Sequence, residues 1–266
     1  FCWMCWRRLH SEYQPLMPSN MYKKGIYKVV DNKALTRDVW RMVLAGDTQW
    51  ITRPGQFVNI ELEGLYLRRP ISISDWSEDT ITIIYKVVGR GTEQMSRMTE
   101  GQELDVLTGL GNGFDADVEC QRPLLVGGGV GVPPLYRLAK ELIARDRKVS
   151  VVLGFNTAKE LFYADEFRAL GADVYVSTAD GSVGTKGFVT DAIRENGVDF
   201  DFFYSCGPLP MLKALCDCTD VSGELSFEER MGCGFGACMG CSCKTLAGNK
   251  RICKDGPVMK REEIIW

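Results

Sequence analysis

One stretch of this sequence reads Cys233-Gly-Phe-Gly-Ala-Cys238-Met-Gly-Cys241, and a further cysteine follows at position 253. Four residues separate the first two cysteines and two separate the next pair, which is the ligand spacing of a plant-type [2Fe–2S] cluster. Three thiolates from one loop reach two irons only where the backbone curls tightly, and the interleaved glycines permit that curl. We therefore expect Cys233, Cys238, Cys241 and Cys253 to bind the metal, which makes an electron carrier the leading hypothesis.

Other uses of these cysteines remain open at this point. Four thiolates also hold structural zinc, although zinc sites are usually built from two separated, closely spaced pairs. Disulfides or unused thiols are further alternatives. Cys243 is close enough in sequence to compete with Cys241 as a ligand. We exclude Cys243 because the spacing is complete without it.

The composition narrows the class of protein. With 266 residues, of which 45% are hydrophobic and 25% charged, the chain is long enough for two or three ordinary globular domains. A net charge of −3 and scattered lysines and arginines argue against nucleic-acid binding. No apolar run is long enough to span a bilayer. Eleven cysteines without a recognisable secretory signal fit a reducing cytoplasm.

The only histidine is His10, in a segment that shows no clear period. Its position removes a histidine general base, a Ser-His-Asp triad and a histidine metal site from consideration, since each needs an imidazole inside a domain. We interpret residues 1–20 as a disordered or non-native tail, with a partner-binding arm as a minor alternative. Met21 is a plausible natural start.

Residues 21–119 are predicted to form an antiparallel β-barrel. Short runs of β-branched and aromatic residues are separated there by Gly, Pro, Asp and Asn. Six such strands without a strong helical pattern favour a small barrel. The expected strands cover residues 25–30, 40–44, 57–62, 71–74, 80–88 and 104–107.

Residues 120–220 show a different period and are predicted to form an α/β domain with a parallel sheet. The expected strands are 123–126, 149–153, 173–177 and 200–205, and the expected helices are 135–144, 164–170, 189–195 and 211–216. The segment 221–266 is short and rich in glycine and cysteine, so this last domain is expected to depend on its bound metal for stability.

Two segments are suited to phosphate groups. The loop Gly127-Gly-Gly-Val-Gly-Val-Pro-Pro134 lies between a strand and a helix, where backbone N–H groups favour a pyrophosphate. It departs from the G-x-G-x-x-G fingerprint at Val132, and the next strand ends in Gly154-Phe155 without an acidic residue. An ordinary Rossmann dehydrogenase is therefore disfavoured, and a tight turn without a ligand remains the alternative.

The second segment combines Arg69 with Ser72 on an extended chain, where cation and hydroxyl can hold a diphosphate by charge-assisted hydrogen bonds. A solvated strand edge is the simpler alternative. Further on, Gly91 and Thr92 open a predicted helix that runs to Met98, which offers another anion-binding helix start.

Taken together, these motifs resemble the ferredoxin–NADP reductase superfamily. The resemblance rests on Arg-Pro-Ile-Ser at 69–72, Gly-Thr at 91–92, Gly-Asn-Gly-Phe at 111–114, the 127–134 loop and Cys-Gly-Pro at 206–208, in that order. With the cysteine segment appended, residues 21–266 are similar to the electron-transfer subunits of NAD-dependent dihydroorotate dehydrogenases. The tail has no counterpart in that pattern, and Ile71 stands where many relatives have an aromatic residue.

The resemblance implies cofactor sites for FAD, NAD and a [2Fe–2S] cluster, and no catalytic residue beyond the cofactor contacts. FAD contacts would come from Arg69, Pro70, Ile71 and Ser72, from Ile84, Tyr85 and Lys86 beside the flavin ring, and from Gly91 and Thr92. NAD contacts would come from Gly128, Gly129, Gly131, Cys206 and Gly207. Cys206 would lie beside the hydride path, although a buried cysteine at a strand end is the common alternative.

The implied function is that of an oxidoreductase subunit in pyrimidine biosynthesis. It would pass electrons between NAD and a partner FMN subunit that oxidises dihydroorotate, in a heterotetramer with two of each chain. An exposed apolar face near the cluster is expected if that partner is permanent. We expect NAD rather than NADP, because the segment at 177–182 carries Asp180 and no arginine.

Two alternatives differ in function. The flavin subunit of a sulfide dehydrogenase or of a ferredoxin-dependent transhydrogenase shares this architecture, but its first cluster ligand is typically aspartate, so Cys233 favours the dihydroorotate interpretation. A zinc-stabilised binding module without turnover is the alternative from another class.

Overall fold

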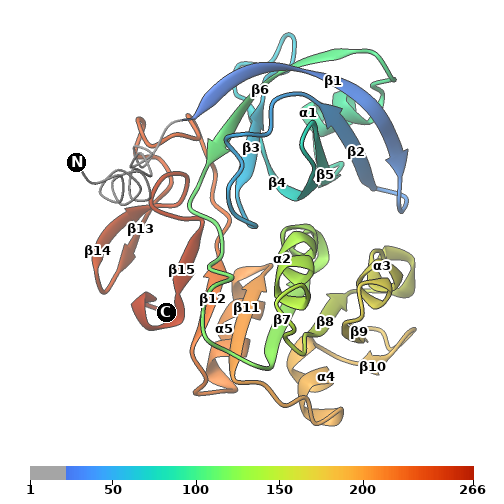
Figure 1. Cartoon of the computed structure of the whole chain (residues 1–266), viewed down its shortest axis with the longest axis vertical. Helices are drawn as coiled ribbons and strands as arrows, with labels where there is room; N and C mark the ends of the chain where they lie inside the picture. Colours follow the sequence, from blue (N-terminus) through green and yellow to red (C-terminus); the bar gives the residue numbers. More distant parts are fainter. Residues whose placement is uncertain (1–21) are drawn as a thin grey trace, which may run out of the picture.

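The computed structural model describes residues 22–266, which form a β-barrel, an α/β domain and a cysteine-rich lobe (Figure 1). The tail predicted at residues 1–20 lies outside the described residues. Within 22–266, no helix combines the length and the apolar character needed to cross a membrane.

Six antiparallel strands close the barrel in the order β1-β2-β5-β4-β3-β6. Their inward residues alternate along each strand, as Val58 and Ile60 do on β3, so each strand buries one face in the barrel core. All six expected strands are present, with ends shifted by a few residues. They are β1 (Lys23–Ala34), β2 (Val39–Ala45), β3 (Phe57–Ile60), β4 (Arg69–Trp76), β5 (Thr80–Lys86) and β6 (Glu103–Leu110), and the short helix α1 (Arg90–Ser96) follows β5.

The α/β domain is built on a seven-stranded sheet in the order β10-β9-β8-β7-β11-β12-β15, in which only β15 is antiparallel to its neighbour. The strands are β7 (Pro123–Gly128), β8 (Ser150–Phe155), β9 (Asp173–Thr178), β10 (Thr185–Lys186), β11 (Phe202–Cys206), β12 (Gly223–Ser226) and β15 (Val258–Lys260). The predicted parallel α/β fold is confirmed. The two-residue β10 and the strands β12 and β15, which lie beyond residue 220, were not expected.

Helices cover both faces of this sheet because alternate residues of β7 pack in opposite directions. Leu125 packs with α2 (Pro133–Ile143) and α3 (Ala164–Ala169) on one face. Leu124 and Val126 pack with α4 (Val189–Glu195) and α5 (Leu209–Asp217) on the other. Burial on both faces explains the continuous apolar run of this strand.

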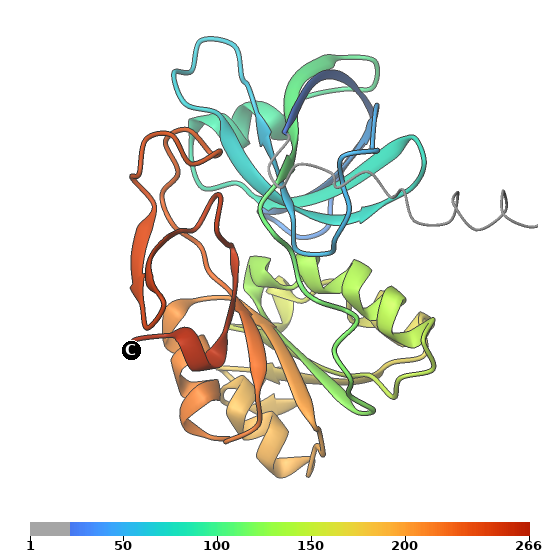
Figure 2. The same cartoon turned by 60° about the vertical axis from the view of Figure 1, so that its left-hand side comes forward.

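The cysteine-rich lobe packs against both the barrel and the α/β domain (Figure 2). Its hairpin, β13 (Ser242–Thr245) and β14 (Gly248–Arg251), is separate from the main sheet, whereas β15 pairs with β12 and so anchors the lobe to the α/β domain. On the other side, Phe57, Leu107 and Leu110 of the barrel share one apolar cluster with the lobe, to which Cys241, Ile252, Cys253 and Met259 contribute.

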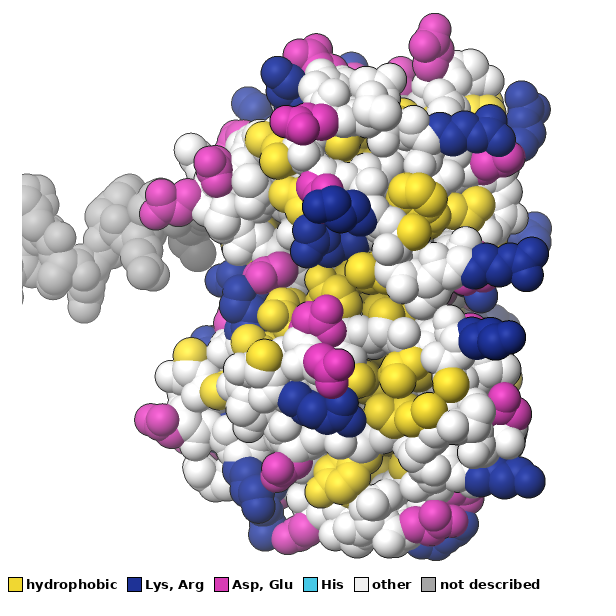
Figure 3. Space-filling view, turned by 90° about the vertical axis from the view of Figure 1, so that its right-hand side faces the viewer, with side chains coloured by type: hydrophobic (Ala, Val, Ile, Leu, Met, Phe, Trp, Pro, Cys, Tyr) yellow, Lys and Arg dark blue, Asp and Glu magenta, His cyan; other side chains and the backbone are white. Residues whose placement is uncertain are grey.

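The barrel meets the α/β domain along β4 and α2. The Arg137 guanidinium lies 4.0 Å from the ring centroid of Trp76, and the carboxylate of Asp75 pairs with Arg137 at 3.3 Å and with Lys140 at 2.7 Å. Hydrophobic side chains also gather in the middle of the face shown in Figure 3, where the two halves of the molecule meet. The strand that carries Arg69 and Ser72 at its start therefore carries the domain contact at its end.

Candidate cofactor and metal sites

The four expected cluster ligands form two pairs of thiols. In the first pair, the backbone N–H of Cys238 donates to Sγ of Cys233 at 3.4 Å. Cys241 and Cys253 form the second pair, in which the backbone N–H of Cys253 donates to Sγ of Cys241 at 3.4 Å. Each pair combines the ligands that a two-iron cluster needs at one iron.

Backbone N–H groups of the cysteine loop point at sulfur. Those of Ala237 and Cys238 donate to Sγ of Cys233 at 3.2 and 3.4 Å. Burial opposes ionisation of Cys233, but the hydrogen bonds from Cys238, Phe235 and Ala237 outweigh it and lower the pKa of this thiol to about 6. Gly234 and Gly236 have φ of 80° and 91°, a backbone conformation that glycine adopts most readily.

The donor set fits a [2Fe–2S] cluster better than a single ion. A tetrahedral zinc site would bring four thiolates to one point. Two thiol pairs with N–H groups directed at sulfur are instead the environment of a cluster whose two irons take two thiolates each.

Arg251 braces this loop in a way that the sequence did not suggest. Its guanidinium forms a bidentate pair with Asp255 at 2.9 and 3.1 Å and donates to the carbonyl of Gly236 at 3.1 Å. Arg251 thereby links the segment that bears Cys253 to the loop that bears the other three ligands.

On the barrel, Arg69 and Gly91, for both of which phosphate contacts are expected, lie against each other and form what we call the Arg69–Gly91 cradle. A Cβ atom at Gly91 would overlap the Arg69 guanidinium, so the cation lies directly across the start of α1. Arg69 is half-buried and donates to the carbonyl of Leu67. The Thr92 hydroxyl is used locally, because it accepts the N–H of Val88 at 3.0 Å. Pro70, Ile71 and Ser72 follow Arg69 on β4, all half-buried.

The three residues expected beside the flavin ring do not face one way. Tyr85 points into the barrel, where its hydroxyl donates to Oδ1 of Asn32 at 3.0 Å and burial raises its pKa. Ile84 and Lys86 face the α/β domain, Ile84 in the shared core and Lys86 at the wall of a cavity. Strand alternation thus leaves Tyr85 only its backbone for a cofactor.

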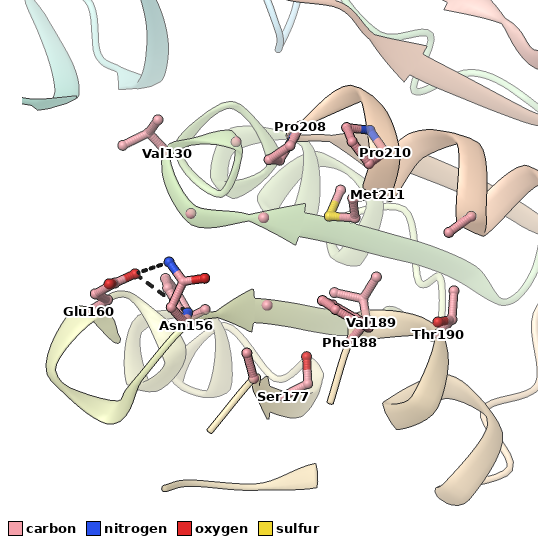
Figure 4. A pocket seen from close by; sticks show the side chains of 18 of the residues that line it. Val130, Asn156, Glu160, Ser177, Phe188, Val189, Thr190, Pro208, Pro210 and Met211 are labelled. Carbon is pink, nitrogen blue, oxygen red and sulfur yellow. Dashed lines mark hydrogen bonds between the residues drawn. The ribbon is translucent and has the colours of Figure 1, made fainter. Parts of the chain in front are cut away.

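A cavity of about 650 Å³ opens at the carboxyl ends of β7, β8, β9 and β11, the edge where nucleotides bind to parallel sheets (Figure 4). Gly128, Gly129, Gly131 and Gly207 line it. A Cβ atom at Gly131 would collide with the carbonyl of Cys206, so the loop approaches β11 as closely as glycine allows. The expected glycines therefore meet at one place.

Cys206 lies at the end of β11 and is only 1% exposed. Burial raises the pKa of its thiol. The cavity wall is formed by the next residue, Gly207, and by Pro208. The structure thus gives Cys206 the character of a buried strand-end cysteine directly behind the cavity.

Several cavity residues were not predicted. Glu160 accepts hydrogen bonds from the side chain and backbone of Asn156 at 3.0 and 3.4 Å (Figure 4). Ser177 has a buried hydroxyl without a partner among the described residues. The remaining unpredicted wall includes Phe188, Val189, Thr190, Pro210, Met211 and Glu228. Their shared signal is a position just after parallel strands or at the start of a helix.

The acidic residue at this cavity differs from the expected one. The Asp180 carboxylate accepts the N–H and hydroxyl of Ser182 at 2.9 and 2.6 Å, and Asp180 does not line the cavity. Glu160, which follows β8, does. Glu228 contributes a second carboxyl, whose pKa is raised because protein surrounds it.

Two family models match separate parts of the chain. Residues 228–265 match the iron-sulfur cluster binding domain of dihydroorotate dehydrogenase B. Residues 125–217 match the oxidoreductase NAD-binding domain. These ranges cover the cysteine segment and the strands and helices that build the cavity.

Curated relatives match along nearly the whole chain. The dihydroorotate dehydrogenase B (NAD(+)) electron transfer subunit of Fusobacterium nucleatum is 48% identical over 250 residues, which cover 89% of this chain and 96% of that protein. The subunit of the same name from Lysinibacillus sphaericus is 47% identical and covers 91% of this chain and 98% of that protein.

Solved structures agree on the fold. A structure of the NADH-dependent reduced ferredoxin-NADP oxidoreductase superposes with a TM-score of 0.82 at 32% identity, covering 91% of this chain and 90% of that one. The FAD/NAD-binding domain of a Vibrio cholerae nitric oxide dioxygenase shares the fold with a TM-score of 0.64 at 23% identity, over 74% of this chain and 92% of that one.

Proposed function

Since the chain belongs to the family of dihydroorotate dehydrogenase B (NAD(+)) electron transfer subunits, we propose that it carries electrons between NAD and a catalytic partner subunit. The observation that supports this most directly is the gathering of three sites around one barrel: the thiol pairs, the Arg69–Gly91 cradle and the cavity of the α/β domain. When bound, FAD exchanges an electron pair with the nicotinamide, and the cluster exchanges single electrons.

The residues of this chain bind, orient and shield the cofactors. Arg69 would hold the FAD diphosphate by charge, and the absence of a side chain at Gly91 leaves room for the Arg69 guanidinium beside the start of α1. Ile84 and Lys86 project from β5 toward the α/β domain, where the flavin ring and the nicotinamide would meet. Apolar side chains such as Val189 and Met211 keep water from the cavity wall.

The finer parts of the proposal concern the assembly. The partner is the FMN subunit that oxidises dihydroorotate, and the complex is a heterotetramer with two of each chain in the cytoplasm, acting in pyrimidine biosynthesis. The exposed apolar side chains Met239, Leu246, Ile265 and Trp266, all on the cysteine-rich lobe, support a permanent partner there.

The nucleotide is NAD rather than NADP. A 2′-phosphate needs a cationic fork, and among the residues that line the described cavity Lys86 is the single cation. Its ammonium group is paired with Asp38 at 3.1 Å, and the same lining holds the carboxyl groups of Glu160 and Glu228. The Glu160 carboxylate, held by Asn156, is suited to accept hydrogen bonds from ribose hydroxyls and would repel a phosphate.

Reconstitution tests the proposal directly. The anaerobically prepared chain should contain iron, inorganic sulfide and FAD and reduce a dye with NADH. Dihydroorotate-dependent reduction of NAD should appear only when the FMN subunit is added. Zinc in place of iron, or electron exchange with ferredoxin but not with the FMN subunit, would contradict it.

A further inference from the structure

Asn59 is a polar side chain buried between the barrel and the cysteine-rich lobe. It lies in the middle of β3 and is only 1% exposed. Its neighbours Val58 and Ile60 point into the barrel core. Asn59 therefore shares the outer face of the strand with Phe57, whose ring packs into the apolar cluster of the lobe.

The carboxamide of Asn59 holds the cysteine loop at its first ligand. Nδ2 donates to the carbonyl of Cys233 at 3.1 Å, and only the amide nitrogen can donate to a carbonyl, so this contact fixes which way the side chain points. A Cβ atom at Gly234 would overlap Nδ2. The loop thus passes directly over Asn59.

The other end of the same carboxamide is unsatisfied. Oδ1 of Asn59 is buried and has no hydrogen-bond partner among the described residues. An unpaired buried acceptor destabilises a protein, and leucine would fill this volume without that cost. The donor end must therefore offset the cost, and its one contact is the backbone of Cys233.

Asn59 also lies one strand away from the flavin motif. On β4 it is paired with Pro70, while the adjacent pairs are Ile60 with Arg69 and Val58 with Ile71. One hydrogen bond thus joins the backbone of a cluster ligand to the strand next to Arg69 and Ser72. Among the described residues, no other side-chain hydrogen bond connects the barrel to the 233–241 loop.

We propose that Asn59 is a positioning residue that fixes the cysteine loop, and with it the cluster, relative to the flavin-bearing strand β4. This inference rests on the function proposed above. Asn59 acts through the backbone of Cys233, so its loss would leave all four ligands in place but would loosen the loop that carries three of them.

The test compares Asn59→Leu and Asn59→Asp with the wild-type chain, all anaerobically reconstituted. Leucine removes the donor and keeps the volume, whereas aspartate keeps the shape but directs a carboxylate oxygen at the Cys233 carbonyl. Iron release to a chelator should be about fivefold faster in the leucine variant, the factor that corresponds to the loss of one net hydrogen bond of about 1 kcal/mol. The aspartate variant should lose iron faster still.

Spectroscopy separates positioning from general stability. The electron paramagnetic resonance spectrum of the reduced cluster should broaden or shift in both variants, and in stopped-flow mixing with NADH cluster reduction should slow while flavin reduction stays within about twofold of wild type. Val58→Ala is the matched control, since it weakens the barrel core from the next position on the same strand.

Gly234→Ala provides an independent variant, because its methyl group would push against Nδ2 of Asn59. Its effect on the spectrum should be partly relieved in the double variant with Asn59→Ala. Wild-type protein without iron would refute the proposed function itself. Iron-loaded protein in which Asn59→Leu matches wild type in iron release and spectrum, or in which Val58→Ala reproduces its changes, would overturn the positioning role alone.

Discussion

For the cysteines, the spacing in the sequence predicts which residues are ligands, whereas only the structure gives their hydrogen bonds. These hydrogen bonds pair Cys233 with Cys238 and Cys241 with Cys253. Cys243 lies only two residues beyond Cys241 on the hairpin strand β13, and burial raises its pKa. The assignment of the ligand cysteines therefore needs a test of its own, apart from the surroundings of each thiol.

Substitution of neighbouring cysteines tests the ligand assignment. Cys241→Ser should lose most of the iron and the visible absorbance of the cluster, because one iron would lose a thiolate. Cys243→Ser should keep both. The measurement is the ratio of iron to protein after anaerobic reconstitution, and equal iron contents in the two variants would refute the assignment.

Glu160 should determine the choice of nucleotide. Glu160→Gln removes the negative charge but keeps an acceptor beside Asn156, so the preference for NADH over NADPH should fall by about fivefold, as expected for about 1 kcal/mol of electrostatic repulsion in a partly exposed cavity. The kcat/KM values for the two nucleotides provide the measurement. Asp180→Asn is the control, since that carboxylate is bound within its own turn; a larger effect of this control would contradict the assignment.

Glu224 should make stability depend on pH. It is 7% exposed on β12 and accepts the N–H of Asp115 at 2.9 Å. Burial raises its pKa, the hydrogen bond from the Asp115 N–H and the charges of Lys260 and Arg53 lower it, and the charge of Asp115 raises it, so that the pKa moves from 4.5 to about 7. Because the folded protein holds this proton more tightly than the unfolded chain, the stabilisation is complete below pH 4.5 and is lost as the pH rises through about 7.

Glu224→Gln removes this dependence while keeping an acceptor for Asp115. Relative to wild type, the variant should gain about 2 kcal/mol in the free energy of unfolding between about pH 5.5 and about pH 8.5, from the linkage relation with these pKa values. Urea denaturation at both pH values measures it. A difference between the two proteins that does not change with pH would exclude this role of Glu224.

At the scale of elements, β4 connects two functions. Its first half carries Arg69 and Ser72, and its last residues, Asp75 and Trp76, contact α2 through Arg137. Arg137 also forms an ion pair with Glu141 at 2.9 Å and donates a hydrogen bond to the carbonyl of Trp76 at 2.9 Å. The strand that would orient the flavin is thus also the strand that holds the NAD domain.

Arg137→Gln should therefore slow the reaction between the two domains. The loss of a partly buried ion pair and a cation–π contact amounts to about 1–2 kcal/mol, so flavin reduction by NADH should be roughly tenfold slower while NADH affinity changes little. Arg137→Lys should rescue only in part, because lysine lacks the planar group that stacks on Trp76. Arg168→Gln, which removes a surface pair with Asp165, is the control. An unchanged rate in Arg137→Gln would contradict this role.

The sequence predicted the helices and strands better than it predicted where individual side chains point. All six barrel strands follow from runs of β-branched and aromatic residues between turn residues, and the helices of the α/β domain follow from the change to a helical hydrophobic period. The strands β12 and β15 are too short to show a period, and their pairing joins segments far apart in the chain. Tyr85 and Asp180 were expected near cofactors, yet strand alternation and a local turn direct both side chains elsewhere.

At the scale of the whole molecule, the barrel is the common support. Its strand β4 faces the α/β domain, and its strands β3 and β6 face the cysteine-rich lobe through Phe57, Leu107 and Leu110. The barrel therefore contacts the domain that holds the cavity through one strand and the lobe that holds the thiol pairs through two others. In Figure 2 the lobe lies along one side of the barrel and of the α/β domain.

Met239 should mark the surface where that protein docks. It lies between Cys238 and Cys241, two of the proposed cluster ligands, has a φ of 60° and is 55% exposed, so its side chain projects from the cysteine loop. Met239→Asp would bury a charge in the interface and should weaken binding of the FMN subunit at least about tenfold, as for a central interface residue. Reduction of NAD by dihydroorotate should fall accordingly, whereas reduction of a small dye by NADH should not, because the dye needs no docked protein.

Val183→Asp places the same charge at an exposed apolar position of the α/β domain and should change neither rate. If the two variants bound the FMN subunit equally well, measured by titration of one subunit with the other, the partner would have to dock away from the cysteine loop.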